Sequence, residues 1–114
     1  MKVTIITVCF NAATDLQKTL DSVLNQQYTD LEYLVVDGGS RDNTLDLLKH
    51  YKPLFDKAGK VFRYVSEKDK GTYDAMNKGA RMAQGEWINY MNAGDTFYDA
   101  TTLQEFFSQN INQE

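Results

Sequence analysis

Two oxygen-bearing side chains, Asn92 and Asp95, flank the small residues Ala93 and Gly94 directly after the apolar run 87–91. Amide and carboxylate oxygens are the hard ligands that Mg²⁺ and Mn²⁺ prefer in proteins. A cation held by only two protein groups would take its remaining ligands from water and from a bound diphosphate. The same residues would equally fit an Asx turn that closes a strand.

A second polar turn begins at Asp37, which is followed by Gly38 and Gly39. A carboxylate there could accept hydrogen bonds from a nucleobase or a ribose, and the glycines would let a ligand approach the backbone closely. A plain turn or a helix cap would use the same residues. The chain contains no GxGxxG or P-loop sequence, which argues against a dinucleotide dehydrogenase or a P-loop NTPase.

A third polar cluster runs from Asp69 through Lys70 and Gly71 to Asn77 and Lys78. Asn77 falls inside a predicted helix, where asparagine is a poor helix former, so we expect it to bind a neighbouring loop or a ligand. The two lysines could neutralise phosphate, although lysines in such positions also occur as solvated surface residues. Nearby apolar side chains are expected in the core: Cys9, Tyr73, Met76 and Met82.

Hydrophobic patterning predicts four strands that alternate with four helices. The strands are expected at residues 2–10, 31–36, 60–65 and 87–91, and the helices at 14–24, 42–52, 73–83 and 101–108. Such alternation indicates βαβ units, a parallel sheet and right-handed crossovers. Ligands bind at the carboxyl ends of the strands in these sheets, which is where all three polar turns fall.

Several element boundaries carry local signals. Thr14 and Gln17 have the spacing of a capping box at the start of the first helix, and Asp42 or Ser40 could cap the second. Pro53 is expected to weaken or end the second helix. Gly85 would be the C-cap of the third helix. The run 87–91 is predicted to be a buried strand because it is largely apolar.

Composition fits one domain of 114 residues with 42% hydrophobic and 25% charged residues. The net charge of −4 and the lack of a basic stripe exclude a nucleic-acid-binding protein. No apolar run approaches the ~20 residues that span a bilayer, and the amino terminus does not resemble a signal peptide. The single cysteine precludes an internal disulfide, which fits a reducing cytoplasm. Because the net charge is negative, the phosphates of a bound ligand would have to be neutralised by backbone N–H groups or a divalent cation.

Four segments in this order resemble the family 2 inverting glycosyltransferases: ITVCFNA, VVDGGSRDNT, EKDKGTYDAMNKG and ARMAQGEWINYMNAGD. The similarity covers about residues 2–100 and is greatest to bacterial members that build capsular, lipopolysaccharide or colanic-acid-like polysaccharides. It implies a GT-A fold, in which a Rossmann-like, mostly parallel sheet is flanked by helices. In that family this half of the domain binds a nucleotide-diphosphate sugar.

The resemblance also implies which residues bind the donor. The nucleotide site is assigned to Thr7, Val8, Phe10, Asn11, Asp37, Lys70, Gly71 and Asn77. The motif Gly-x-x-x-Ala-x-Asn-x-Gly of the family matches Gly71, Ala75, Asn77 and Gly79. The metal-binding motif falls on Asn92 and Asp95, which would bind Mg²⁺ or Mn²⁺.

The chain departs from the family pattern in two ways. The acidic motif usually has more carboxylates, whereas this sequence keeps only Asp95 and has Asn92 in the first acidic position. The family also has a later stretch that supplies the acceptor site and the catalytic base. We therefore expect residues 1–114 to be the donor-binding part of one domain, truncated at its C-terminal end, with the base beyond Glu114.

The implied reaction is sugar transfer with inversion from a nucleotide-sugar, with a UDP-sugar as the expected donor. The acceptor would be a hydroxyl of a glycan or a lipid-linked molecule, in the cytoplasm or at the inner face of the membrane. An oligomer is compatible with the sequence. Two alternatives stay open: a catalytically inactive nucleotide-sugar-binding module, and a flavodoxin-like signalling domain, which the four ordered segments do not favour.

Overall fold

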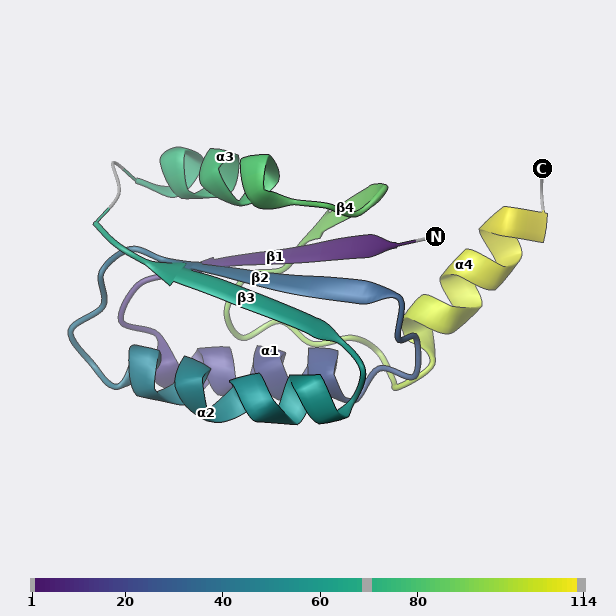
Figure 1. Ribbon diagram of the computed structural model, residues 1–114, viewed down its shortest axis with the longest axis horizontal. Helices are drawn as coiled ribbons and strands as arrows, with labels where there is room; N and C mark the ends of the chain where they lie inside the picture. The colour runs from purple at the N-terminus through teal and green to yellow at the C-terminus, as the bar shows by residue number, and fades with distance from the viewer. Residues whose placement is uncertain (1, 69–70, 113–114) are drawn as a thin grey trace.

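The four strands form one parallel sheet in a computed structural model that describes residues 2–68 and 71–112 (Figure 1). The strands are β1 (Val3–Cys9), β2 (Leu31–Asp37), β3 (Val61–Ser66) and β4 (Trp87–Tyr90). Their order across the sheet is β3-β2-β1-β4, so β1 pairs with both β2 and β4. The expected α/β architecture with a parallel sheet is confirmed.

Helices cover both faces of this sheet. They are α1 (Ala13–Leu24), α2 (Thr44–Lys57), α3 (Thr72–Met82) and α4 (Thr102–Asn112). Figure 1 shows α1 and α2 side by side on one face and α3 on the other. The last helix, α4, lies beyond the end at which β1 and β2 begin, away from the carboxyl ends of the strands.

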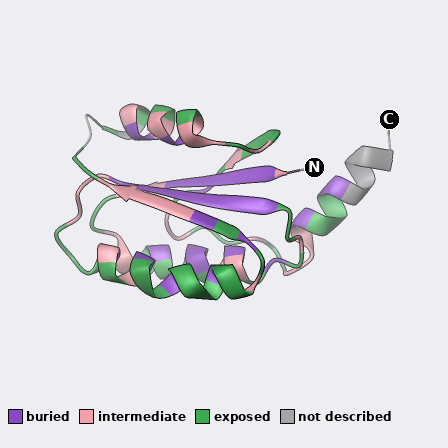
Figure 2. Cartoon of the chain, viewed as in Figure 1, coloured by how far each residue is buried: buried purple, intermediate pink, exposed green. Residues whose placement is uncertain are grey.

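The main hydrophobic core lies between the sheet and the pair α1 and α2. Leu16, Leu20 and Val23 form the apolar stripe of α1 and are fully buried. Two aromatic side chains, Phe55 of α2 and Phe62 of β3, stack with their ring centroids 4.7 Å apart. Both faces of β1 and β2 are covered, as their almost continuous apolar sequences predict, and Figure 2 shows these two strands buried along nearly their full length.

Small residues let α3 pack closely on the opposite face of the sheet. A Cβ atom added to Gly79 would lie 2.8 Å from Cγ2 of Ile6, so a larger residue there would have to displace the Ile6 side chain. Ala75, one helical turn earlier, is buried on the same side, whereas Asn77 is exposed. In the glycine–alanine–asparagine–glycine motif, Ala75 and Gly79 therefore pack against the sheet, whereas Asn77 faces solvent.

Three of the local expectations at helix ends are wrong. The first helix has Ala12 as its N-cap with no side-chain cap, so Thr14 and Gln17 form no capping box. Instead, the N–H of Ala13 donates to Asp42 Oδ2 at 3.3 Å, a contact from the loop after β2. Helix α2 continues through Pro53 to Lys57 because Pro53 lies on the exposed side of the helix, where water can replace the missing bond.

Gly85 is not a helix cap, because Ala83 already ends α3 in an extended conformation. Its N–H instead donates to Thr4 Oγ1 at 2.9 Å. A Cβ atom there would lie 2.5 Å from that oxygen and 2.7 Å from Thr4 N. Glycine is required because the chain must pass this close to β1 on its way into β4.

The prediction that 87–91 forms a fully buried strand is also wrong. β4 is an edge strand, and Trp87, Ile88 and Tyr90 are each 42–44% exposed. Only Met91, just past the strand, is buried. Tyr73 was likewise expected in the core but is 84% exposed at the start of α3.

Candidate functional site

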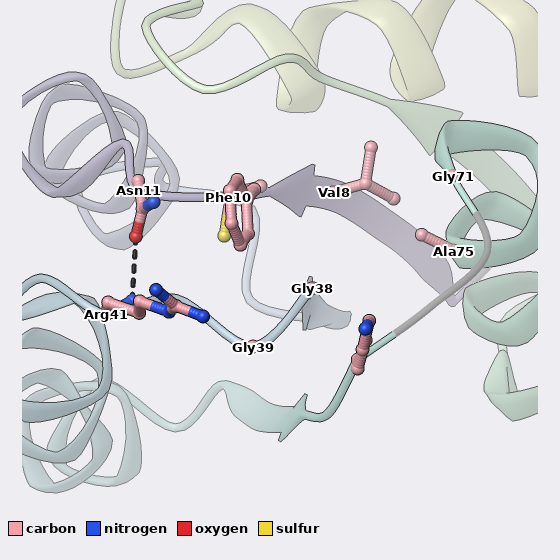
Figure 3. Close-up of a pocket in the computed structure, with 10 residues that line it drawn as sticks. Val8, Phe10, Asn11, Gly38, Gly39, Arg41, Gly71 and Ala75 are labelled. Carbon is pink, nitrogen blue, oxygen red and sulfur yellow. Dashed lines mark hydrogen bonds between the residues drawn. The ribbon is translucent and has the colours of Figure 1, made fainter.

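A pocket of about 660 Å³ opens at the carboxyl ends of β1 and β2 (Figure 3). It is lined by residues of four neighbouring segments: Val8, Cys9, Phe10, Asn11, Gly38, Gly39, Arg41, Lys68, Gly71 and Ala75. These segments are the end of β1, the loops after β2 and β3, and the start of α3. The pocket therefore occupies the edge of a parallel sheet at which ligands are expected to bind.

The loop after β1 gives the pocket an aromatic wall and a backbone anchor. Phe10 is 58% exposed, so much of its ring faces solvent or a ligand. Asn11 has a left-handed backbone with φ of +48°. Its Oδ1 accepts the N–H of Arg41 at 2.7 Å, and its own N–H donates to Ser40 Oγ at 2.7 Å. Asn11 thus fixes the loop after β2 to the loop after β1.

Asp37 lies behind the pocket and is completely buried. Its carboxylate accepts the N–H of Ser40 at 2.8 Å and the hydroxyl of Ser66 at 2.7 Å, and it also accepts the Ser40 hydroxyl. Both of its acceptor oxygens receive hydrogen bonds from protein donors, and Asp37 is not among the residues that line the pocket. These hydrogen bonds hold together the loops that follow β2 and β3, and a contact between Asp37 and a nucleoside stays a prediction.

Thr7 and Asn77 are also outside the pocket lining. The Thr7 side chain is buried in the core, where its Oγ1 accepts the Tyr33 hydroxyl at 2.8 Å. Burial raises the pKa of Tyr33, so this hydroxyl remains a donor. Asn77 is exposed on α3, and Lys70 lies outside the described residues. Among the predicted nucleotide-site residues, the pocket brings together Val8, Phe10, Asn11 and Gly71.

The prediction missed two cations and a cysteine at the pocket. Arg41 and Lys68 are exposed side chains that line it from the loops after β2 and β3. Their position directly after predicted strands was the signal that could have identified them. Cys9 donates its thiol to Asp37 Oδ1 at 3.5 Å, and burial followed by the charge of Asp37 raises the pKa of this thiol. Cys9 therefore stays protonated at neutral pH and has no nucleophilic character.

Asn92 and Asp95 form a tight turn after β4, next to the end of β1. The N–H of Asn92 donates to Asp95 Oδ2 at 2.9 Å, and the N–H of Asp95 donates back to the Asn92 carbonyl at 2.9 Å. Thr19 of α1 fixes this turn by donating its hydroxyl to the Asp95 carbonyl at 2.8 Å. Gly94, with φ of +102°, allows the turn to pass close to Asp15.

This turn fits a cation that takes most of its ligands from elsewhere. The side chains of Asn92 and Asp95 are both exposed, and Asp95 Oδ2 accepts the N–H of Asn92. Within residues 2–68 and 71–112, no three histidine, cysteine or carboxylate side chains are grouped to hold a metal. The donor set therefore suits Mg²⁺ or Mn²⁺ shared with a phosphate ligand.

A family model described as "Glycosyl transferase family 2" matches residues 4–109 of this chain. The chain belongs to this family. A PGL/p-HBAD biosynthesis glycosyltransferase of Mycobacterium bovis (strain BCG / Pasteur 1173P2) is 39% identical over 87% of this chain. An uncharacterized glycosyltransferase of Escherichia coli (strain K12), YibD, is 27% identical over 85% of it. The chain spans only 38% and 27% of the length of these two relatives.

Solved glycosyltransferase structures share the fold. A mannosyltransferase from Pyrobaculum calidifontis, in complex with GDP-Man and Mn²⁺, aligns with a TM-score of 0.78 and 27% identity. That alignment covers 86% of this chain and 29% of the mannosyltransferase. S. aureus TarS 1-349, in complex with UDP-GlcNAc, aligns with a TM-score of 0.83 over 98% of this chain and 32% of TarS. Because TarS and this chain are only 21% identical, their structural similarity supports the shared GT-A fold and nothing more specific.

None of the helices in the described part of the chain is long and apolar enough to cross a bilayer.

Proposed function

We propose that this chain binds the nucleotide-diphosphate sugar donor of a glycosyltransferase, in the pocket at the carboxyl ends of β1 and β2. The observation that carries the proposal is the lining of this pocket. The structure gathers Val8, Phe10, Asn11 and Gly71 there, from segments separated by up to 63 residues in the sequence. Family membership and the GDP-Man complex of the mannosyltransferase support the same ligand class.

Each part of the pocket has a chemical function in this proposal. The Phe10 ring offers a face on which a nucleobase can stack. Gly38, Gly39 and Gly71 leave room for the ligand beside the backbone. Asn11 and Asp37 hold the loops that form the walls, so the pocket is largely formed before the donor binds.

The turn after β4 would hold Mg²⁺ or Mn²⁺. Asp95 is the expected carboxylate ligand, and Asn92 an auxiliary ligand or a residue that orients Asp95 through its N–H. When bound, the cation would supply positive charge to the leaving nucleoside diphosphate. The Mn²⁺ in the mannosyltransferase complex supports this assignment. Asp15, across Gly94, adds negative charge next to the turn.

The reaction we propose for the whole protein is transfer with inversion. An acceptor hydroxyl would form a bond to the anomeric carbon as the bond to the diphosphate breaks, and its proton would pass to a general base outside the residues assigned here. A UDP-sugar is the proposed donor. The acceptor would be a cell-surface glycan or lipid-linked precursor on the cytoplasmic side. The mycobacterial relative is described as a biosynthesis glycosyltransferase, which supports a biosynthetic reaction.

A titration of UDP with and without Mn²⁺ tests this proposal. Two protein ligands cannot saturate a divalent ion, so metal and nucleotide should strengthen each other's binding, and the coupling must be reciprocal. We expect Mn²⁺ to lower the Kd of UDP by roughly tenfold, within the range typical of such coupling. Asp95→Ala should abolish the enhancement, whereas Asp46→Ala on the exposed side of α2 should keep it. UDP binding that ignores Mn²⁺ in the wild type would exclude the metal site.

A further inference from the structure

Arg41 projects into the pocket from the loop after β2, on the same side as Phe10 and opposite Gly71 and Ala75 (Figure 3). Its side chain is exposed, and no ion pair joins it to a carboxylate within the described residues. A guanidinium without a carboxylate partner beside an exposed aromatic ring is suited to bind a planar, hydrogen-bonding ligand.

The backbone of Arg41 is held by hydrogen bonds, although its side chain forms no ion pair with the residues that the structure describes. Its N–H donates to Asn11 Oδ1 at 2.7 Å. The next residue, Asp42, is anchored to two helices, since its carboxylate accepts the N–H of Ala13 at 3.3 Å and that of Thr44 at 3.0 Å. The guanidinium therefore extends from a fixed point, which limits where it can bind a ligand.

The strand order decides which part of the donor lies beside Arg41. β1 separates β2 from β4, so Arg41, after β2, and Asp95, after β4, stand on opposite sides of the end of β1. If the diphosphate lies near Asp95, as the proposed function requires, the nucleoside extends across β1 toward β2. Arg41 is then beside the base and not beside the phosphates.

We propose that Arg41 is a specificity-determining residue that selects nucleobases with a carbonyl, rather than an amino group, at C4 of a pyrimidine or C6 of a purine, and this assignment rests on the proposed function. The guanidinium has five N–H donors and no acceptor. It can donate to O4 of uracil or to O6 and N7 of guanine. Cytosine and adenine present an amino group at the corresponding position, so donor would face donor. Phe10 supplies stacking, which does not distinguish among bases.

The test uses two pairs of nucleoside diphosphates whose members differ at this position: UDP with CDP, and GDP with ADP. Binding of each to the 114-residue chain is measured by calorimetry in the presence of Mn²⁺. The variant is Arg41→Met, which keeps the length and packing of the stem but removes every donor. The matched control is Arg81→Met, an exposed arginine of α3 that does not line the pocket.

We expect the pocket to accept one of the two pairs, either the pyrimidine or the purine diphosphates. Within that pair, the wild type should bind UDP roughly tenfold more tightly than CDP, or GDP roughly tenfold more tightly than ADP, as one good guanidinium–base contact allows. Arg41→Met should weaken only that member and leave the pair nearly equal, whereas Arg81→Met should behave as the wild type. An equal loss for both members would show that Arg41 contacts the diphosphate, and an unchanged preference would show that it contacts nothing; either overturns the assignment. If no diphosphate binds the wild type, the proposed function itself fails, which is a distinct result from binding without base preference.

Discussion

Asp37 connects three loops through one buried carboxylate. It accepts hydrogen bonds from Ser40 in its own loop, from Ser66 at the end of β3, and from the thiol of Cys9 at the end of β1. Ser40 in turn accepts the N–H of Asn11. The walls of the pocket therefore share one anchor that a ligand need not touch.

Asp37→Asn should destabilise the domain. The substitution replaces one acceptor oxygen with an NH₂ group, which would face hydroxyl and N–H donors in a buried site. Loss of charge-assisted bonds of this kind costs about 2–3 kcal/mol. Urea unfolding followed by circular dichroism measures the change, with Asp56→Asn as the control because Asp56 forms an exposed pair with Lys52 at 3.0 Å. Equal midpoints for Asp37→Asn and the wild type would contradict the anchoring function.

The sequence predicted part of this pocket and missed the remainder for identifiable reasons. The strand–turn patterns and the family resemblance located Phe10, Asn11 and Gly71, because a residue that follows a parallel strand must lie at the carboxyl edge. Whether a side chain at that edge points into the pocket depends on partners far along the chain. Asp37 turns toward Ser66, 29 residues away, and no local pattern indicates this pairing. Arg41 resembles any solvated loop cation until the fold brings it beside Phe10.

Among the secondary-structure elements, α3 is fastened to the sheet by a buried charge network. Glu32, on β2, accepts hydrogen bonds from the Thr4 hydroxyl at 2.8 Å, from Arg63 of β3 at 3.1 Å, and from the N–H of Gln84. Arg63 also donates to the carbonyl of Met82, the last residue of α3. One carboxylate thus joins β1, β2, β3 and the segment that leads from α3 to β4.

The network makes stability depend on pH. Burial would raise the pKa of Glu32, but the hydrogen bonds from Gln84, Thr4 and Arg63 outweigh it, and the pKa lies below the ordinary value of 4.5. A carboxylate with a lowered pKa stabilises the fold fully above its ordinary pKa. That contribution is lost as the pH falls below about 4.5 and through the lower pKa of the folded state.

Glu32→Gln should therefore lower stability at pH 7 by about 3 kcal/mol, because Arg63 would lose its charge partner. The difference between variant and wild type should shrink at pH 3. Chemical denaturation at both pH values measures it, and Glu105→Gln on the exposed side of α4 serves as the control. If the difference in unfolding free energy between Glu32→Gln and the wild type is the same at pH 7 and pH 3, the charge of Glu32 does not stabilise the fold.

Element types and their order followed from the sequence, whereas several element ends did not. Pro53 is tolerated because the fold places it on an exposed helix face, and Gly85 is needed because β1 passes within contact distance. Both facts concern neighbours that local sequence does not specify. The apolar run 87–91 has the composition of a central strand, but its place at the edge of the sheet leaves it half covered.

In the molecule as a whole, the edge of the sheet formed by β4 is open. β4 pairs only with β1 in the part of the chain that the structure describes. Ile88 and Tyr90 are 42% and 44% exposed and, by their register with Thr4 and Ile6, lie on the same face as α3. An apolar edge strand of this kind is prone to pair with another chain.

We expect this chain to self-associate along β4 as its concentration rises. Sedimentation velocity from about ten to several hundred micromolar protein should show a growing dimer fraction, in the range of weak edge-to-edge contacts. The double substitution Ile88→Lys and Tyr90→Lys should keep the chain monomeric, since lysine blocks pairing at edges. Lysines at the exposed positions Leu54 and Val61, away from β4, provide the control. A wild type that stays monomeric at every concentration would rule out the edge as an association surface.

The central position of β1 also has a consequence for synthesis on the ribosome. Val3 pairs with Leu31 on one side and with Trp87 on the other, so one edge of the first strand stays without its partner until residues 87–90 have been made. Pairings between residues so far apart close large loops and form slowly. The nascent chain can assemble β1, α1 and β2 early, but the turn that carries Asp95 reaches its place against Thr19 of α1 only when β4 docks. The turn proposed to hold the metal should therefore be among the last parts of these residues to reach its folded position.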